Sequence, residues 1–88
     1  MTLDDIKACI ARDGYVSTRT LTLQLWDESP AEGNWVVVRE QNARFAVLKK
    51  RCGTYLRKLH QQGVLVVSKQ SWFEPIFGQQ PTEYQLAE

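Results

Sequence analysis

The stretch KKRCGTYLRKLHQQGVLV, residues 49–66, decides the fold, because it joins a helical pattern to a strand. Gly53 lies inside the helical part, where a glycine costs about 1 kcal/mol relative to alanine. It can therefore mark the turn between two helices, or it can lie within one long helix. The answer determines which side chains face the solvent, and so what the protein contacts.

The apolar side chains on both sides of Gly53 share one helical register. Spaced at about 100° per residue, they fall within an arc of roughly 100°. They are Phe45, Leu48, Cys52, Tyr55, Leu56 and Leu59. A turn at Gly53 would rotate the second half of this stripe away from the first. We therefore predict one continuous helix over about residues 42–62, capped by Asn42 and ended by Gly63.

The opposite face of this helix is basic and polar. Arg44 lies at its edge and Lys49 on its far flank, and its centre carries Lys50, Arg51, Thr54, Arg57, Lys58 and Gln61. A solvated helix face normally mixes charges of both signs, yet no acid occurs between residues 41 and 67. Because uncompensated cations repel one another, this face predicts a polyanionic partner.

The charge of the whole chain is segregated in the same way. The 88 residues carry a net charge of +1, but seven basic residues and one acid lie between residues 39 and 58. That segment carries +6 and the remainder −5. The apolar content of 43% is typical of one globular domain and argues against disorder.

Several functional classes are not supported by the sequence. Cys9 and Cys52 are too few for a disulfide framework, and with one histidine they do not suggest a zinc site. We predict two reduced core thiols, and neither a metal nor another cofactor. No nucleophile has an evident base, and no glycine-rich phosphate loop occurs, which argues against an enzyme. Without a leader pattern or an apolar run of about 18 residues, a cytoplasmic protein without membrane contact is expected.

The segments before the long helix are less uniform. Leu3–Gly14 follows a helical period and ends at a glycine. Residues 18–26 are ambiguous, because TLTLQL alternates like a strand whereas Ser17 is a good helix N-cap. An acidic loop then leads to Trp35–Val38, whose β-branched side chains predict a strand.

The segment after the long helix predicts a β-hairpin. VLVVSK and TEYQLA read as two strands, joined by the long loop QSWFEPIFGQQP. The hairpin is expected to span residues 64–87.

These features together resemble winged helix-turn-helix DNA-binding domains. YLRKLHQQGVLVVSKQ and PTEYQLAE are similar to the end of the family's recognition helix and to its hairpin wing. The matching positions are Leu56, Arg57, Leu59, Gly63, Val64, Leu65, Tyr84 and Leu86. IKACIARDGYVSTRTLTLQL is similar to the family's first helix, short first strand and second helix. The resemblance implies one α+β domain over residues 1–88, with three helices and a C-terminal wing, and favours a helix at residues 18–26.

The chain departs from the family pattern at three places. Residues 27–41 stand where the family usually has a short turn, which implies an inserted segment with an extra strand. The wing tip, SWFEPIFG, is apolar where the family usually carries cations, and Lys69 is the only cation nearby. If residues 18–26 form a strand, the element order becomes αββαββ and the domain is not a winged helix.

The resemblance implies sequence-specific binding of double-stranded DNA by a small transcriptional regulator or a mobile-element accessory factor. The helix of about residues 42–62 is expected to enter the major groove. The expected contacts are Arg44, Lys49, Lys50, Arg51, Thr54, Arg57, Lys58, Gln61 and Lys69. RNA is a further partner that a basic helix allows.

The alternative is a protein-interaction module of the same fold. It would dock a partner protein, or a second copy in a homodimer, through the aromatic wing or the Trp35–Val38 segment. The candidate contact residues are Trp35, Trp72, Phe73 and Phe77.

Overall fold

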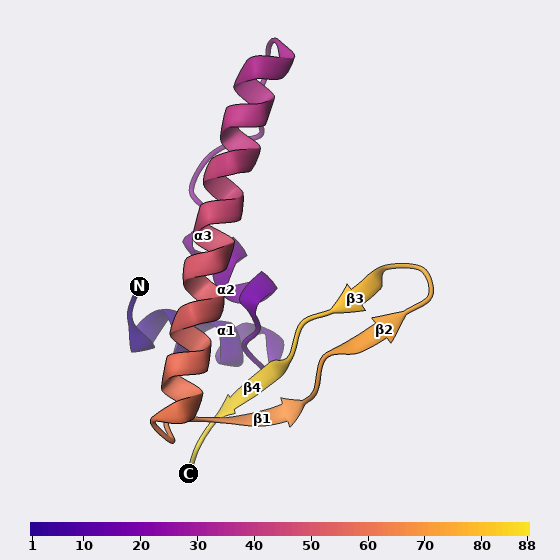
Figure 1. Ribbon diagram of the computed structural model, residues 1–88. Helices are drawn as coiled ribbons and strands as arrows, with labels where there is room; N and C mark the ends of the chain where they lie inside the picture. The colour runs from indigo at the N-terminus through magenta and orange to yellow at the C-terminus, as the bar shows by residue number, and fades with distance from the viewer.

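The computed structural model describes all 88 residues, as three helices followed by two antiparallel hairpins (Figure 1). The elements are α1 Leu3–Asp13, α2 Thr18–Leu25, α3 Trp35–Gln61, β1 Leu65–Lys69, β2 Trp72–Glu74, β3 Gly78–Gln80 and β4 Glu83–Leu86. This α+β order is consistent with a winged helix. The αββαββ alternative is wrong, because residues 18–25 are helical. None of the helices combines the length and the apolar character needed to cross a membrane.

The helix α2 forms although its sequence alternates like a strand. Ser17 caps it as predicted, since the Ser17 hydroxyl accepts a hydrogen bond from the Thr20 N–H at 3.3 Å. The Thr22 hydroxyl donates to the Thr18 carbonyl, which satisfies this buried polar group within the helix. Leu21 is fully buried whereas Leu23 is 57% exposed, so the alternating leucines do not share one face.

The helix α3 begins one residue after Asn34, seven residues earlier than predicted. The Asn34 side chain accepts hydrogen bonds from the N–H groups of Val36 and Val37, both at 3.1 Å. The predicted strand at Trp35–Val38 is therefore wrong, and Asn42 lies inside the helix rather than capping it. A strand there would have no neighbouring strand with which to pair, whereas the cap at Asn34 satisfies the first helical N–H groups.

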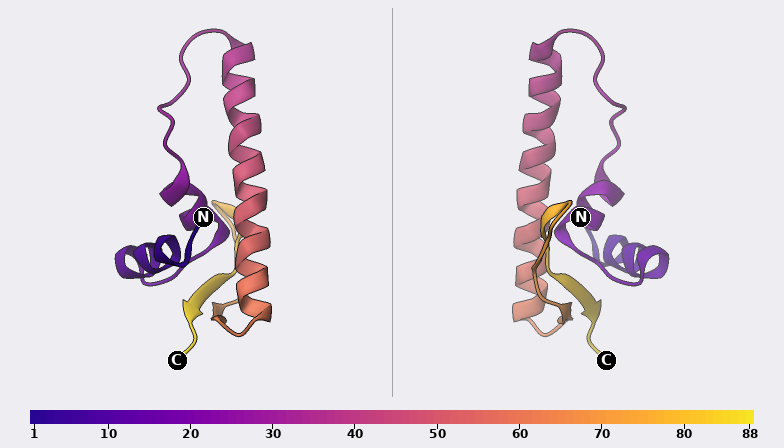
Figure 2. Two further views of the ribbon diagram at one scale, coloured as in Figure 1. Left: turned by 90° about the vertical axis from the view of Figure 1, so that its left-hand side faces the viewer. Right: turned by 90° about the vertical axis from the view of Figure 1, so that its right-hand side faces the viewer.

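With 27 residues, α3 is about 40 Å long, and its N-terminal half extends beyond the rest of the domain (Figures 1 and 2). The loop before α3 is fastened to this half. The Gln41 side chain donates to the Ser29 carbonyl at 2.6 Å and accepts from the Ala31 N–H at 2.9 Å. The rings of Trp26 and Phe45 meet edge to face at 5.1 Å. The inserted segment, residues 27–41, thus consists of a loop that is hydrogen-bonded to α3 and the first two turns of α3, and it contains no strand.

The core joins all three helices to the first and last strands. Its buried members are Ile6, Cys9, Val16, Leu21, Cys52, Leu56, Leu59, Leu65 and Tyr84. Both cysteines are unpaired and buried, as predicted, and burial raises the pKa of both thiols. The apolar stripe of α3 supplies three core members, and Leu48 and Tyr55 pack against them.

The wing predicted over residues 64–87 is present but is built from two hairpins. β1 pairs with β4. An isolated bridge between Val16 and Tyr84 extends this pairing to the segment between α1 and α2. The segment expected to be a long loop contains β2 and β3, which pair with each other as a narrow ribbon. Figure 1 shows this ribbon projecting sideways from α3. The tip of the wing is therefore a β-hairpin and not an irregular loop.

Gly53 lies within the continuous helix α3, as the apolar stripe predicts. A Gly53→Ala change is expected to raise the free energy of unfolding by up to ~1 kcal/mol. The added Cβ would meet Arg57 Nη1 at 3.5 Å and Thr18 Oγ1 at 3.6 Å, which are ordinary contacts. Urea denaturation of the two proteins measures the change.

Gly63 provides the matched control for this prediction. It ends α3 with a φ of +79°, a conformation that favours glycine. Gly63→Ala is therefore expected to lower the free energy of unfolding. A loss of stability in Gly53→Ala as well would show that the α2–α3 contact has no room for a methyl group.

Candidate nucleic-acid interface

One side of α3 is free of other elements. Figure 2 shows α1, α2 and the loop before α3 on a single side of this helix. The opposite side carries exposed polar and charged side chains, which we call the basic face: Lys50, Arg51, Thr54, Arg57, Lys58 and Gln61. The structure thus brings the centre of the predicted site together on one open surface.

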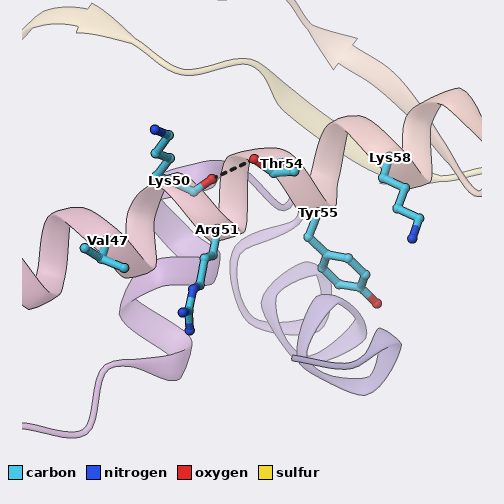
Figure 3. Close-up of a pocket in the computed structure, with 6 residues that line it drawn as sticks. All are labelled: Val47, Lys50, Arg51, Thr54, Tyr55 and Lys58. Carbon is cyan, nitrogen blue, oxygen red and sulfur yellow. Dashed lines mark hydrogen bonds between the residues drawn. The ribbon is translucent and has the colours of Figure 1, made fainter.

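Figure 3 shows how the middle of this surface is arranged. Lys50 points to one side of the helix, whereas Arg51 and Lys58 point to the other. Together with Val47, Thr54 and Tyr55 they line a shallow groove of about 610 Å³. The Thr54 hydroxyl donates to the Lys50 carbonyl at 3.1 Å, so it lies close to the helix backbone. The longer charged side chains therefore project beyond it.

A second groove lies where α2 crosses α3. It has a volume of about 330 Å³ and is lined by Thr18, Ala46, Lys49, Lys50, Gly53 and Arg57. Gly53 is buried at this crossing, and the Thr18 side chain packs beside it, 3.6 Å from the position that a Cβ would take. The N-terminus of α2 is thereby brought beside the cations of α3.

A third groove, of about 320 Å³, joins this crossing to the base of the wing. Its lining residues are Arg19, Lys49, Ser71, Gln79, Gln80 and Pro81. Arg19 donates to the Gln80 side-chain oxygen at 2.8 Å, and Lys49 borders both this groove and the second one. A continuous polar and basic path therefore runs from α3, past the start of α2, to the wing.

Arg19 is absent from the residues predicted for the site. It lies far from the basic helix in the sequence, and only the fold brings it near Lys49. One signal was available, because a cation in the first turn of a helix opposes the helix dipole. A cation in that position is therefore expected to interact with a group outside its own helix.

Two of the predicted DNA-contact residues, Arg44 and Lys69, instead interact with other side chains of the protein. Arg44 forms a two-pronged ion pair with Glu28, with N–O distances of 3.0 and 2.7 Å, and this pairing lowers the pKa of the Glu28 carboxyl. The Lys69 amino group lies 3.7 Å from the centre of the Trp72 ring. Both cations lie outside the basic face.

The predicted partner-contact residues do not form one surface. Trp35, 68% exposed, lies at the free end of α3 beneath the guanidinium of Arg39. Trp72, Phe73 and Phe77 belong to the β2–β3 ribbon, which projects elsewhere (Figure 1). The chain thus exposes two separate apolar patches.

No cation of the basic face takes part in an ion pair. The two ion pairs of the domain join Arg12 to Asp13 and Arg44 to Glu28. Lys49 and the four cations of the basic face therefore have no carboxylate within 4.0 Å. Such an arrangement can bind a polyanion without first breaking an internal ion pair; the one side-chain hydrogen bond among these cations joins Arg57 to Thr54 at 3.4 Å.

Comparison of the chain with protein-family models, with curated proteins and with solved structures finds no match. The function proposed below therefore rests on the chemistry of this surface.

Proposed function

We propose that the protein binds double-stranded DNA through the basic face of α3 and the adjoining groove at the base of the wing. The observation that carries the proposal is a set of five exposed cations on α3 without any carboxylate partner: Lys49, Lys50, Arg51, Arg57 and Lys58. Each can neutralise a phosphate and release a counterion, which is the main source of affinity for a duplex.

The shape of the surface also suits a duplex. An α-helix with its side chains is about 10–12 Å across, and the major groove of B-DNA is about 12 Å wide. The free side of α3 can therefore enter the groove with Arg51 and Arg57 directed at base edges. Arginine suits this position because its guanidinium can form two parallel hydrogen bonds to guanine.

The residues beside α3 would then hold the DNA backbone. Lys49, Arg19 and Gln79 line the groove that leads to the wing. Cations and amides in such positions contact phosphates and fix the orientation of the helix on the duplex. Specificity would come from α3, which matches the role expected of a small transcriptional regulator or a mobile-element accessory factor.

Binding to duplex DNA is expected to weaken steeply with salt. About four phosphate contacts, from Lys49, Lys50, Lys58 and Arg19, give a slope near −4 for the logarithm of the binding constant against the logarithm of the salt concentration. Fluorescence anisotropy of a labelled duplex, titrated between about 50 and 200 mM salt, measures this slope. A flat slope, or no binding at the lowest salt, would contradict the proposal. Single-stranded RNA of equal length serves as the comparison ligand.

A second candidate is favoured by the apolar end of α3. Trp35, Val36, Val37 and Val38 are 68, 39, 42 and 37% exposed. Exposed apolar patches on helices commonly mark protein contacts, here with a second copy of the chain or another protein. Substituting Val36 and Val37 by serine should abolish such a contact and leave DNA binding intact, with sedimentation velocity as the measurement. Substituting the cations of the basic face by alanine should abolish DNA binding and leave this protein contact intact.

A further inference from the structure

The free side of α3 carries a second pattern besides its cations. Exposed residues recur there at alternating steps of four and three: Val36, Glu40, Ala43, Val47, Lys50 and Thr54. This spacing is the heptad pattern by which two helices pack against each other in a coiled coil, so we call the row the seam. The seam is about 27 Å long and lies on the side of α3 opposite the buried Cys52.

The seam lies beside a hollow that can receive the side chains of a second helix. The groove of about 610 Å³ shown in Figure 3 is lined by Val47 and Thr54 of the seam and by Tyr55. A further groove of about 350 Å³ continues it, since Val47 and Arg51 line both, and it reaches Ala43 of the seam. A helix laid along the seam would therefore pack its side chains into one continuous groove.

The two charged residues of the seam have no ionic partner within the protein. Glu40 has no cation within 4.0 Å, since the cation one helical turn further on, Arg44, is paired with Glu28 instead. Lys50 has no carboxylate within that distance. The other four seam residues are uncharged. Lone charges in such a row are satisfied by opposite charges on a neighbouring helix, and they fix its direction and register.

A second copy of the chain supplies these opposite charges at matching positions. When two seams pack antiparallel about a two-fold axis between Ala43 and Val47, each Glu40 faces Lys50 of the second copy. The uncharged seam residues then lie opposite one another in the same way. A parallel pair would instead place Glu40 against Glu40 and Lys50 against Lys50. The charges of the seam therefore favour an antiparallel pair of identical chains.

The remainder of each domain leaves room for this pair. α1, α2 and the loop before α3 lie on one side of this helix, and the seam lies on the other (Figure 2). The wider charge distribution also favours the antiparallel direction. Residues 27–40 hold four acids and one cation, whereas residues 49–58 hold five cations and no acid. An antiparallel pair directs the acidic segment of each copy toward the basic segment of the other, which lowers the repulsion between the cations.

We propose that two copies of the chain associate through the seam as an antiparallel pair, and that this pairing masks the basic face. Lys50 and Thr54 belong to both surfaces, and Arg51 lines the groove between them. The free side of α3 therefore cannot hold a second copy and a duplex at the same time. The masking rests on the proposed function, whereas the pairing stands without it. A contact through residues 35–38 alone would be indifferent to Lys50, but pairing through the seam depends on this residue.

Exchange of the two seam charges tests the pairing by sedimentation velocity. The wild-type protein is expected to dimerise, and Glu40→Lys and Lys50→Glu should each raise the dimer dissociation constant by about tenfold or more, because each opposes like charges. An equimolar mixture of these two variants should recover the dimer, since one seam then carries two amines and the other two carboxylates. Lys7→Glu makes the same change of charge on the exposed face of α1 and is expected to leave the dimer unchanged.

A labelled duplex of about 12 base pairs, little more than one helical turn, tests the masking. Added in excess to the wild-type dimer, it should convert the dimer into a complex of one chain with one duplex. A wild-type protein that stays monomeric, or a mixture that fails to recover the dimer, overturns the pairing and leaves the proposed function standing. Binding of the duplex by an intact dimer overturns the masking. If neither the wild-type protein nor Glu40→Lys binds the duplex, the proposed function and the masking are both overturned, and the charge exchange alone decides the pairing.

Discussion

Replacing Lys50, Arg51 and Arg57 together by alanine is expected to lower the affinity for duplex DNA by about a hundredfold or more. Removing a cation that contacts a base or a phosphate costs about 1 kcal/mol or more, and 1.4 kcal/mol corresponds to a factor of ten. All three side chains are exposed and none holds a carboxylate, so their loss should leave the fold intact. Fluorescence anisotropy measures the affinity, and circular dichroism verifies the helix content.

Two control variants separate a local effect from a general effect of charge. The triple variant changes the net charge from +1 to −2, so a second variant should remove cations elsewhere. Lys7 and Arg12 are exposed on α1, away from the basic face, and their replacement by alanine is expected to change the affinity only slightly. An equal loss in this variant would mean that the duplex responds to total charge and not to α3.

The second control keeps the charge and changes its geometry. The Arg51→Lys, Arg57→Lys variant retains both cations, so the salt slope should be unchanged. Lysine cannot form the paired hydrogen bonds of arginine, so discrimination between duplexes of different sequence should fall. Retained discrimination would assign sequence reading to residues other than Arg51 and Arg57, such as Thr54 and Gln61 on the same face.

Leu56→Ala is expected to lower the free energy of unfolding by about 2–5 kcal/mol. Leu56 is 1% exposed and belongs to the core that joins α3 to α1, α2 and the first strand of the wing. A domain of this size has roughly 5–15 kcal/mol of stability at most, so the variant should be close to unfolding at 37 °C. Thermal denaturation followed by circular dichroism should show a fall in Tm of at least about 10 °C.

Val47→Ala is the matched control for this substitution. Val47 lies on the same helix but is 54% exposed, so its truncation should change the stability by less than about 0.5 kcal/mol. Similar losses in the two variants would mean that the stripe through Leu56 does not form the core.

The long helix and its two faces are predictable because one register extends across Gly53. The stripe that contains Cys52, Leu56 and Leu59 can be buried only by a continuous helix, and the cations must then lie opposite. The start of α3 is not predictable in the same way. Four residues with high strand propensity, Trp35–Val38, adopt helix because Asn34 caps them and no strand is available to pair with.

The internal contacts of the predicted site residues cannot be predicted from the local sequence, because they depend on how distant segments pack together. The pairing of Arg44 with Glu28 requires the loop to fold back on α3, which Gln41 fixes through two hydrogen bonds. Arg19 reaches the site only because α2 crosses α3 beside Lys49 and the wing packs against this crossing. The helix at residues 18–25 is predicted by the resemblance to a family and not by its period, since a threonine–leucine alternation fits a strand equally well.

The bridge between Val16 and Tyr84 has a consequence for the order in which the domain forms. The two residues exchange N–H···O bonds of 3.0 and 2.8 Å across 68 positions of the chain. Closing so long a loop is entropically slow, whereas α3 can form from neighbouring residues alone. We therefore expect the cations on α3 to share one surface before Arg19 and Gln79 lie beside them. If the protein binds DNA as proposed, a chain at that stage would bind it through α3 alone, without the groove lined by Arg19 and Gln79.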